Sequence, residues 1–165
     1  MEPKVIIAKF PYEYAAFFQC IGGDEPIHSV YHNMAAWIKK NNLSYKNRII
    51  VGFDEPATWC PDPYGCTIGC IGLYFIDANE IQGGKFRGVH VTKFDTSGNY
   101  ATISINCHIS KAWELLNQWK AKGKYNFDTE SGRQYFEQHI FGDDDFTHDE
   151  RLSFNIWMPV KKLEA

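Results

Sequence analysis

The chain has 165 residues, of which 44% are hydrophobic and 22% are charged, a composition typical of one folded domain with a sizeable core. Its formal net charge of −3 lacks the basic excess that a nucleic-acid-binding surface usually needs. No apolar run approaches the roughly 20 residues that cross a bilayer, and no secretory signal pattern opens the chain. We therefore expect a cytoplasmic protein that binds neither DNA nor a membrane directly.

The five cysteines occur at irregular spacing, which argues against the paired disulfide framework of a secreted domain. Cys60, Cys66 and Cys70 lie close in sequence, but they lack the two matched cysteine pairs of a structural zinc site. We expect reduced, partly buried thiols, no metal and no cofactor. The aromatic content is high, with 12 Phe, 9 Tyr and 5 Trp, and such a surplus suits a pocket that stacks flat or cationic ligands.

The first half of the chain predicts a strand, a helix and two further strands. Residues 14–20 are rich in aromatic side chains, which favours a strand. The acidic residues and proline at 24–26 favour a helix start, and Asn41 is a plausible helix end. Between them apolar residues recur at the spacing of one helical face, namely Ile27, Tyr31, Met34, Trp37 and Ile38. Strand-like segments follow at residues 48–53 and 67–75.

The second half predicts the same order of elements. Residues 88–94 favour a strand, and residues 96–99 favour a turn. A helical face is then formed by Ile105, Ile109, Ala112, Trp113, Leu116 and Trp119. Two strand-like segments, residues 133–141 and 152–158, complete the series. The chain is therefore expected to contain the order strand, helix, strand, strand, twice.

A shift of 76 positions aligns the two halves without a gap. The identical pairs are Lys9 and Lys85, Phe10 and Phe86, Phe18 and Phe94, Gly22 and Gly98, Ile27 and Ile103, His32 and His108, Ala36 and Ala112, and Trp37 and Trp113. We expect one α+β domain over residues 1–165, with pseudo-repeats at about 5–76 and 81–161. An antiparallel sheet should carry the helices on one face, with a ligand cleft on the pseudo-twofold axis between the halves. The alternative is a generic α+β domain whose halves match by chance.

Three segments, residues 81–88 (IQGGKFRG), 134–139 (QYFEQH) and 155–161 (NIWMPVK), resemble motifs of one known family. They are similar to the gyrase-inhibitor-like family, also known as the effector-binding domain of bacterial transcription activators. The resemblance implies duplicated strand-helix-strand-strand units that serve as drug-sensing domains of regulators or as stand-alone proteins. It also implies that Glu137, in the second segment, lies in the ligand cleft. His139 and Trp157 stand where tyrosines are common in the family.

Alternation along the last two strands separates two faces. We expect the mainly aliphatic faces to pack under the helices and the opposite faces to line the cleft with Glu137, His139, Asn155 and Trp157. A carboxylate among rings needs a cation, hydrogen bonds or a proton, so Glu137 is the central ligand-binding residue of this hypothesis. The alternatives are an ion pair of Glu137 at a wet strand edge and a merely half-buried His139. Further wall residues are expected to be Trp37, Trp113, Tyr31 and Phe18, the two tryptophans chiefly as core residues.

Three functions remain open from the sequence. The first is a stand-alone module that binds a small hydrophobic or cationic xenobiotic, with Glu137 as counter-charge and Trp157 as a stacking surface. The second, which the resemblance implies for some relatives, is a hydrolase of reactive strained-ring xenobiotics, with Glu137 as general base and His139 or a tyrosine at the leaving group. The third is haem binding, because a haem-binding family shares a similar duplicated fold. It needs an axial histidine, whereas His32 and His108 are expected to be solvated or structural.

Overall fold

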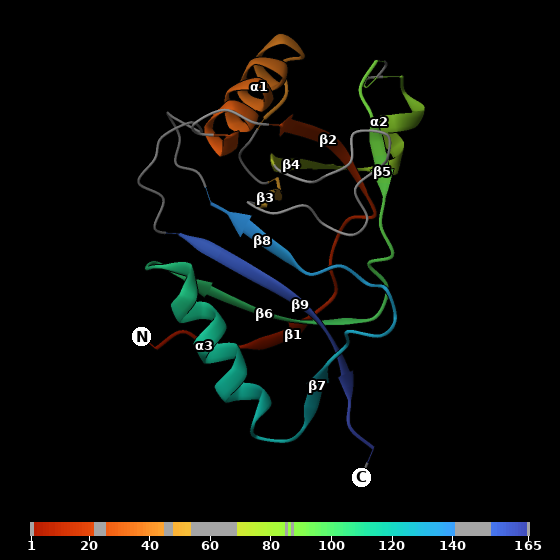
Figure 1. Cartoon of the computed structure of the whole chain (residues 1–165). Coiled ribbons are helices and arrows are strands. Elements are labelled where there is room, and N and C mark those ends of the chain that lie inside the picture. Colours follow the sequence, from red (N-terminus) through yellow and green to blue (C-terminus); the bar gives the residue numbers. More distant parts are fainter. Residues whose placement is uncertain are drawn as a thin grey trace.

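A computed structural model describes residues 2–21, 26–44, 48–53, 69–84, 86, 88–140 and 153–164. Within these ranges the chain forms nine strands and three helices (Figure 1). The strands are β1 (Ile6–Ala8), β2 (Tyr14–Ile21), β3 (Ile50–Phe53), β4 (Gly69–Ile76), β5 (Val91–Lys93), β6 (Asn99–Ile105), β7 (Tyr125–Phe127), β8 (Phe136–His139) and β9 (Phe154–Lys162). The helices are α1 (Pro26–Lys40), α2 (Ala78–Gln82) and α3 (Ile109–Lys120). None of these helices combines the length and apolarity needed to cross a membrane.

The strands form one antiparallel sheet in the order β1-β6-β9-β8-β3-β4-β2-β5, with β7 paired to β9. Two strand-helix-strand-strand runs occur along the chain, β2-α1-β3-β4 and β6-α3-β8-β9, the second with β7 between α3 and β8. Their strands lie in mirrored order on either side of the contact between β8 and β3, where Gln138 pairs with Val51. The predicted antiparallel α+β architecture is thus confirmed, while the common origin of the two runs stays a prediction.

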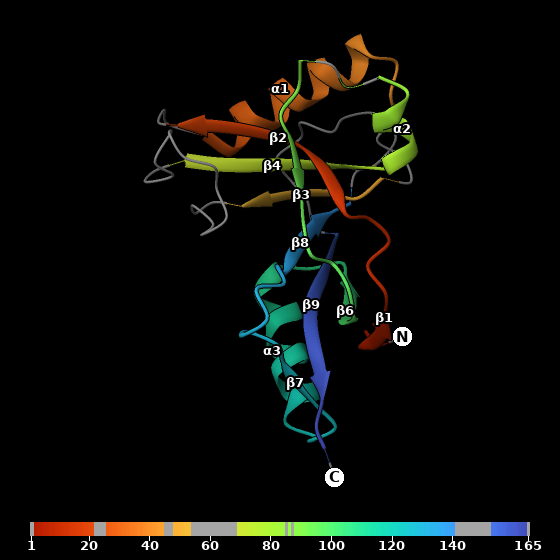
Figure 2. The same ribbon diagram turned by 90° about the vertical axis from the view of Figure 1, so that its right-hand side faces the viewer.

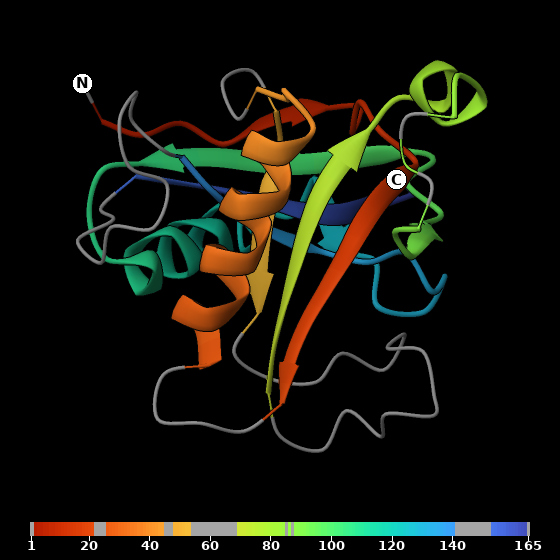
Figure 3. The ribbon, with the colours of Figure 1, turned by 90° about the horizontal axis from the view of Figure 1, so that it is seen from above.

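Helices α1 and α3 pack on the same face of the sheet, each over strands of its own run. Helix α1 packs against β2 and β4 and runs beside them in the view from above (Figure 3), and α3 packs against β6 and β9 (Figure 1). The α1 cluster of buried residues comprises Ala16, Val30, Tyr31, Met34, Ile38, Ile50, Tyr74, Ile76 and Phe86. The α3 cluster comprises Ala101, Ile103, Ile105, Ala112, Leu116, Phe154, Ile156 and Val160. Burial of these stripes at helical spacing stabilises both helices, as the sequence predicted for Tyr31, Met34 and Leu116.

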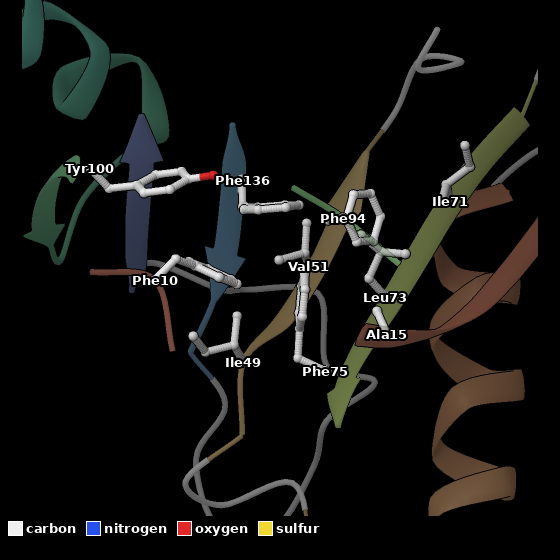
Figure 4. Close-up of a cluster of buried hydrophobic side chains, with 10 residues drawn as sticks. All are labelled: Phe10, Ala15, Ile49, Val51, Ile71, Leu73, Phe75, Phe94, Tyr100 and Phe136. Atoms are coloured by element: carbon white, nitrogen blue, oxygen red, sulfur yellow. The ribbon is translucent and has the colours of Figure 1, made fainter. Parts of the chain in front are cut away.

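The opposite face of the sheet carries a shared aromatic cluster, to which both runs contribute (Figure 4). Its buried members are Phe10, Ala15, Ile49, Val51, Ile71, Leu73, Phe75, Phe94, Tyr100 and Phe136. Phe10 lies between β1 and β2 and Phe94 between β5 and β6, so connecting segments supply part of this core. Figure 2 shows β2 and β4 running across the direction of β9, a strong twist of the sheet between the two runs. The shared aromatic cluster fills the region where the runs meet.

The second run begins later than the sequence predicted. Residues 88–94 were expected to form its first strand, but only Val91–Lys93 are extended, and they pair with β2 at the edge of the sheet. The first strand is instead β6, which includes Asn99 of the expected turn and Ile105 of the expected helix. Its residues Ala101, Ile103 and Ile105 face α3 with the strand period of two. The turn-forming residues at 96–99 favoured a turn directly followed by a helix, so the alternation of β6 was not recognised in the sequence.

The shift of 76 positions does not match equivalent places in the fold. It pairs Ala36 with Ala112, yet Ala36 is exposed and Ala112 is fully buried. It also pairs Phe18 of β2 with Phe94, which lies between two strands. Burial relates Met34 to Leu116 instead, because each lies fully buried at the middle of its helix. The identities at this shift therefore do not define the structural correspondence between the runs.

Candidate functional site

Strand β8 lies at the junction of the two runs and presents Glu137 and His139 to the helix side of the sheet. In the register with β9, Glu137 is opposite Ile156 and His139 is opposite Phe154. Residues directly opposite in an antiparallel pair share a face, and both partners belong to the α3 cluster. The sheet face that holds the two side chains is therefore the one that α1 and α3 cover. The prediction that Glu137 and His139 lie on the face opposite the helices is wrong.

An indole group from α3 holds the Glu137 carboxylate. Trp113 Nε1 donates a hydrogen bond to Glu137 Oε1 at 2.8 Å. The Tyr135 ring packs edge-on against the Trp113 ring, with a centroid distance of 5.5 Å. Glu137 and Trp113 are both half-buried. The neutral N–H group orients the carboxylate and satisfies one of its acceptor positions among aromatic rings.

His139 connects the same strand to the other helix. Its Nδ1 atom forms a hydrogen bond with the Tyr31 hydroxyl of α1 at 2.8 Å. The Phe154 ring packs edge-on against the imidazole at a centroid distance of 5.2 Å. Successive helix-facing residues of β8 thus contact different helices, Glu137 through Trp113 and His139 through Tyr31. A carboxylate, an imidazole and a phenol thus lie on the helix side of the sheet, and we call Tyr31, Trp113, Glu137 and His139 the helix-side group.

Asn155 and Trp157 do not belong to this group, and the prediction that they share a face with Glu137 is wrong. In the observed register, Phe136 is opposite Trp157 and Gln138 is opposite Asn155, on the face of the shared aromatic cluster. Gln138 Oε1 accepts hydrogen bonds from Asn155 Nδ2 at 3.1 Å and from Trp157 Nε1 at 2.9 Å. Alternation was predicted correctly within each strand, but it does not encode the register between two strands.

Trp37 and Phe18 also lie apart from β8. Their rings contact each other at a centroid distance of 5.2 Å, and Trp37 packs against Tyr74 at 5.4 Å. Strand β2, which carries Phe18, is separated from β8 by β4 and β3. Three strand spacings amount to roughly 14 Å. Trp37 is therefore a residue at the periphery of the α1 cluster, consistent with its expected place at the contact between helix and sheet.

Tyr135 and Phe154 are neighbours of Glu137 and His139 that the sequence did not single out. Tyr135 precedes Glu137 by two residues, so strand alternation was a usable signal for it. Phe154 was assigned to the core under the helices, and it does lie there, within contact of His139. The aromatic wall of the group is thus formed partly by core residues.

His32 and His108, the two histidines that the sequence repeat pairs, lie outside this group. His32 is exposed on α1. His108 is the N-cap of α3, where its Nδ1 accepts a hydrogen bond from the Ser110 backbone N–H at 3.3 Å. In the described ranges no three His, Cys, Asp or Glu side chains gather as a metal site. Cys60 and Cys66 lie outside those ranges.

Comparison with known proteins found no matching family model and no matching curated protein. Among solved structures, the chain is similar to an uncharacterized conserved protein from Listeria innocua, with a TM-score of 0.56 and 14% sequence identity over 97% of this chain and 92% of that protein. It is also similar to a hydrolase from Listeria innocua, with a TM-score of 0.52, 14% identity and the same coverage of 97% and 92%. The chain therefore has the fold of these two proteins over nearly its whole length.

Proposed function

We propose that the chain binds a small hydrophobic or cationic organic molecule on the helix side of β8, between α1 and α3. The observation that supports this most directly is the Trp113–Glu137 hydrogen bond, which fixes a half-buried carboxylate beside aromatic rings. Glu137 is also the residue that the gyrase-inhibitor-like resemblance assigns to the ligand cleft. The order and pairing of the strands fit that family's architecture.

The chemistry of the group favours a flat organic cation. A carboxylate that is partly removed from water gains from a nearby positive charge. Each face-on contact between a cation and an aromatic ring contributes about 0.5–2 kcal/mol. Trp113 and Tyr135 place such rings beside Glu137, so one ligand can contact the carboxylate and the rings together. A neutral molecule of the same shape would gain the stacking alone.

Two probes of the same ring system test the proposal. The wild-type protein should bind N-methylquinolinium more tightly than quinoline, measured by calorimetry at a pH where quinoline is neutral. Glu137→Gln should weaken binding of the cation about tenfold and leave quinoline unaffected. Glu114→Gln on α3 is the matched control, because Glu114 is an exposed carboxylate paired with Lys111. Equal affinity for the two probes, or equal effects of the two variants, would contradict the proposal.

A second function, hydrolysis of a strained-ring xenobiotic, is favoured by the Tyr31–His139 hydrogen bond. For an epoxide, Glu137 would take a proton from water while the water oxygen attacks a ring carbon. The carbon–oxygen bond of the ring would break, and the departing oxygen would take the Tyr31 proton, with His139 positioning the hydroxyl. The proton that Glu137 took from water would then pass to the Tyr31 phenolate, which restores both side chains. Water and the epoxide thus yield a diol.

Styrene oxide is a suitable substrate for testing hydrolysis. We expect many equivalents of diol per protein chain, with loss of turnover in Glu137→Gln and a reduced rate in Tyr31→Phe. Glu114→Gln should turn over at the wild-type rate. Product that never exceeds one equivalent would exclude catalysis and leave the binding proposal to the quinolinium measurement.

A further inference from the structure

A hollow of about 870 Å³ lies between α3 and the segment that precedes β1. Its volume falls in the range of about 300–1,000 Å³ that is typical of small-molecule sites. Helix α3 contributes Lys111, Leu115, Gln118 and Trp119 to its lining, and Lys122 follows two residues beyond the end of the helix. At 100° per residue these positions centre on the side of α3 opposite Trp113. The hollow is therefore distinct from the group around Glu137.

The apolar part of the lining is held in place by the protein core. Val5, Leu115 and Trp119 line the hollow and also pack against the α3 cluster. The Trp119 ring is stacked on the Tyr125 ring of β7, with centroids 5.6 Å apart and planes at 17°. This stack fixes the plane of the indole before a ligand arrives. A flat or aliphatic body could bind here without first ordering the side chains, which favours affinity.

The charged part of the lining is positive, although the whole chain has a net charge of −3. Lys4, Lys111 and Lys122 line the hollow together with one carboxylate, that of Glu2. Lys111 Nζ lies 3.0 Å from Glu114 Oε2, which offsets its charge. The three lysines together with the carboxylates of Glu2 and Glu114 therefore carry a net charge of one positive unit. The balance matches a ligand with a single negative charge better than a phosphate dianion.

We propose that this hollow binds small amphipathic monoanions, such as aryl or alkyl carboxylates. Their apolar body would lie on Leu115 and Trp119, and their carboxylate would lie near Lys4 and Lys122. The proposal is independent of the function proposed for Glu137, because the ligand charge is opposite and α3 lies between the two places.

Dansylglycine and its neutral analogue dansylglycinamide test the proposal, because they share one fluorescent ring system. In a fluorescence titration the wild type should bind dansylglycine more tightly. The double variant Lys4→Gln, Lys122→Gln should bind dansylglycine at least about fivefold more weakly, which is the effect of losing one contact ion pair in water. Lys39→Gln with Lys40→Gln removes the same charge from the exposed end of α1 and should leave binding unchanged. Glu137→Gln should also leave it unchanged.

Cys107 reports where the probe binds, because its thiol is free, exposed and part of the lining. Dansylglycine should slow alkylation of Cys107 by iodoacetamide, followed by peptide mass spectrometry, and the slowing should vanish in the Lys4, Lys122 double variant. Equal binding of the two probes, equal effects of the two lysine pairs, or no protection of Cys107 would overturn the proposal. Loss of binding in Glu137→Gln would likewise overturn it by assigning the probe to the other site.

Discussion

Arg133 is a charged side chain that the fold encloses almost completely, with 8% of its side chain exposed. Its Nη2 donates to Asp128 Oδ2 at 2.8 Å, and its Nη1 donates to the backbone oxygens of Ser97 at 2.7 Å and Asn99 at 3.1 Å. The guanidinium holds the pKa of Asp128 well below its ordinary value, together with hydrogen bonds from Ser131. These contacts fasten the connection between β7 and β8 to the start of β6.

We predict that Arg133→Ala lowers the free energy of unfolding by about 3 kcal/mol, because it leaves a buried carboxylate without its cation. Lys161→Ala is the control, since Lys161 forms an exposed ion pair with Glu130 at 3.1 Å. That substitution should cost less than about 0.5 kcal/mol. Urea unfolding measures both variants. Similar costs would show that the enclosure of Arg133 adds nothing to its ion pair.

Two buried tyrosines predict a loss of stability at high pH. Burial raises the pKa of Tyr74 and of Tyr100 from 10.0 to about 12 in the folded protein. As the pH rises from about 10 to about 12, unfolded chains lose these protons first, so deprotonation favours unfolding. The free energy of unfolding should therefore fall through this window. Tyr74→Phe and Tyr100→Phe should each flatten the fall in a pH series of urea titrations, and unchanged slopes would contradict the assignment.

At the scale of elements, α1 approaches β4 closely at Gly72. A Cβ atom at this position would lie 2.5 Å from Val30 Cγ1 and 2.3 Å from Met34 Sδ, too near for either neighbour to stay in place. Gly72 is paired with Gly52 on β3 and with Phe18 on β2, so the strand cannot easily move away. The absence of a side chain sets the distance between helix and sheet.

Gly72→Ala should accordingly destabilise the protein by about 1–3 kcal/mol through overpacking. Val30→Ala added to Gly72→Ala should restore part of the loss, because it removes the rigid neighbour. Thermal unfolding of the two single variants and the double variant measures the coupling between them. Additive effects would mean that the helix can shift without strain.

Elements and residues differ in how far the sequence predicts them. Strands β2, β3, β4, β8 and β9 and both long helices follow from local periodicity, whereas β1 and β7 are short and pair with strands distant in sequence. Tyr31, Trp113, Glu137 and His139 were all among the predicted site residues, because each lies in a strongly patterned element, but Glu137 and His139 were expected on the face away from the helices. Asn155 and Trp157 lie on the face away from the helices, as predicted, whereas Glu137 and His139 lie on the other face, because the register of β8 on β9 depends on tertiary pairing.

For the whole molecule, the shared aromatic cluster joins both runs into one cooperative unit. Phe136 is fully buried and lies at centroid distances of 4.7 Å from Phe10, 5.1 Å from Phe75 and 5.4 Å from Phe94. Phe75 belongs to the first run and Phe136 to the second. Neither run buries this face of its sheet without the other.

We predict that Phe136→Ala lowers the free energy of unfolding by about 3–5 kcal/mol. It should destabilise α1 and α3 together, although Phe136 lies on the face of the sheet away from both helices. Hydrogen exchange should show equal loss of amide protection in Pro26–Lys40 and Ile109–Lys120. Leu116→Ala, which opens a cavity in the α3 cluster alone, is a control for local effects. Faster exchange restricted to α3 in Phe136→Ala would indicate two separately folding halves.

Through Phe10, the first dozen residues of the chain contribute to the core that joins the two runs. The Phe10 ring centroid lies 5.0 Å from that of Phe75, 5.6 Å from that of Tyr100 and 5.2 Å from that of Trp157. In the sequence, however, Phe10 precedes both strand-helix-strand-strand runs. Trimming the chain to start at Tyr14 would preserve both runs and still leave a benzyl-sized void where they join. The truncated protein should be aggregation-prone and poorly soluble, because the rings that Phe10 covers would become an exposed apolar surface.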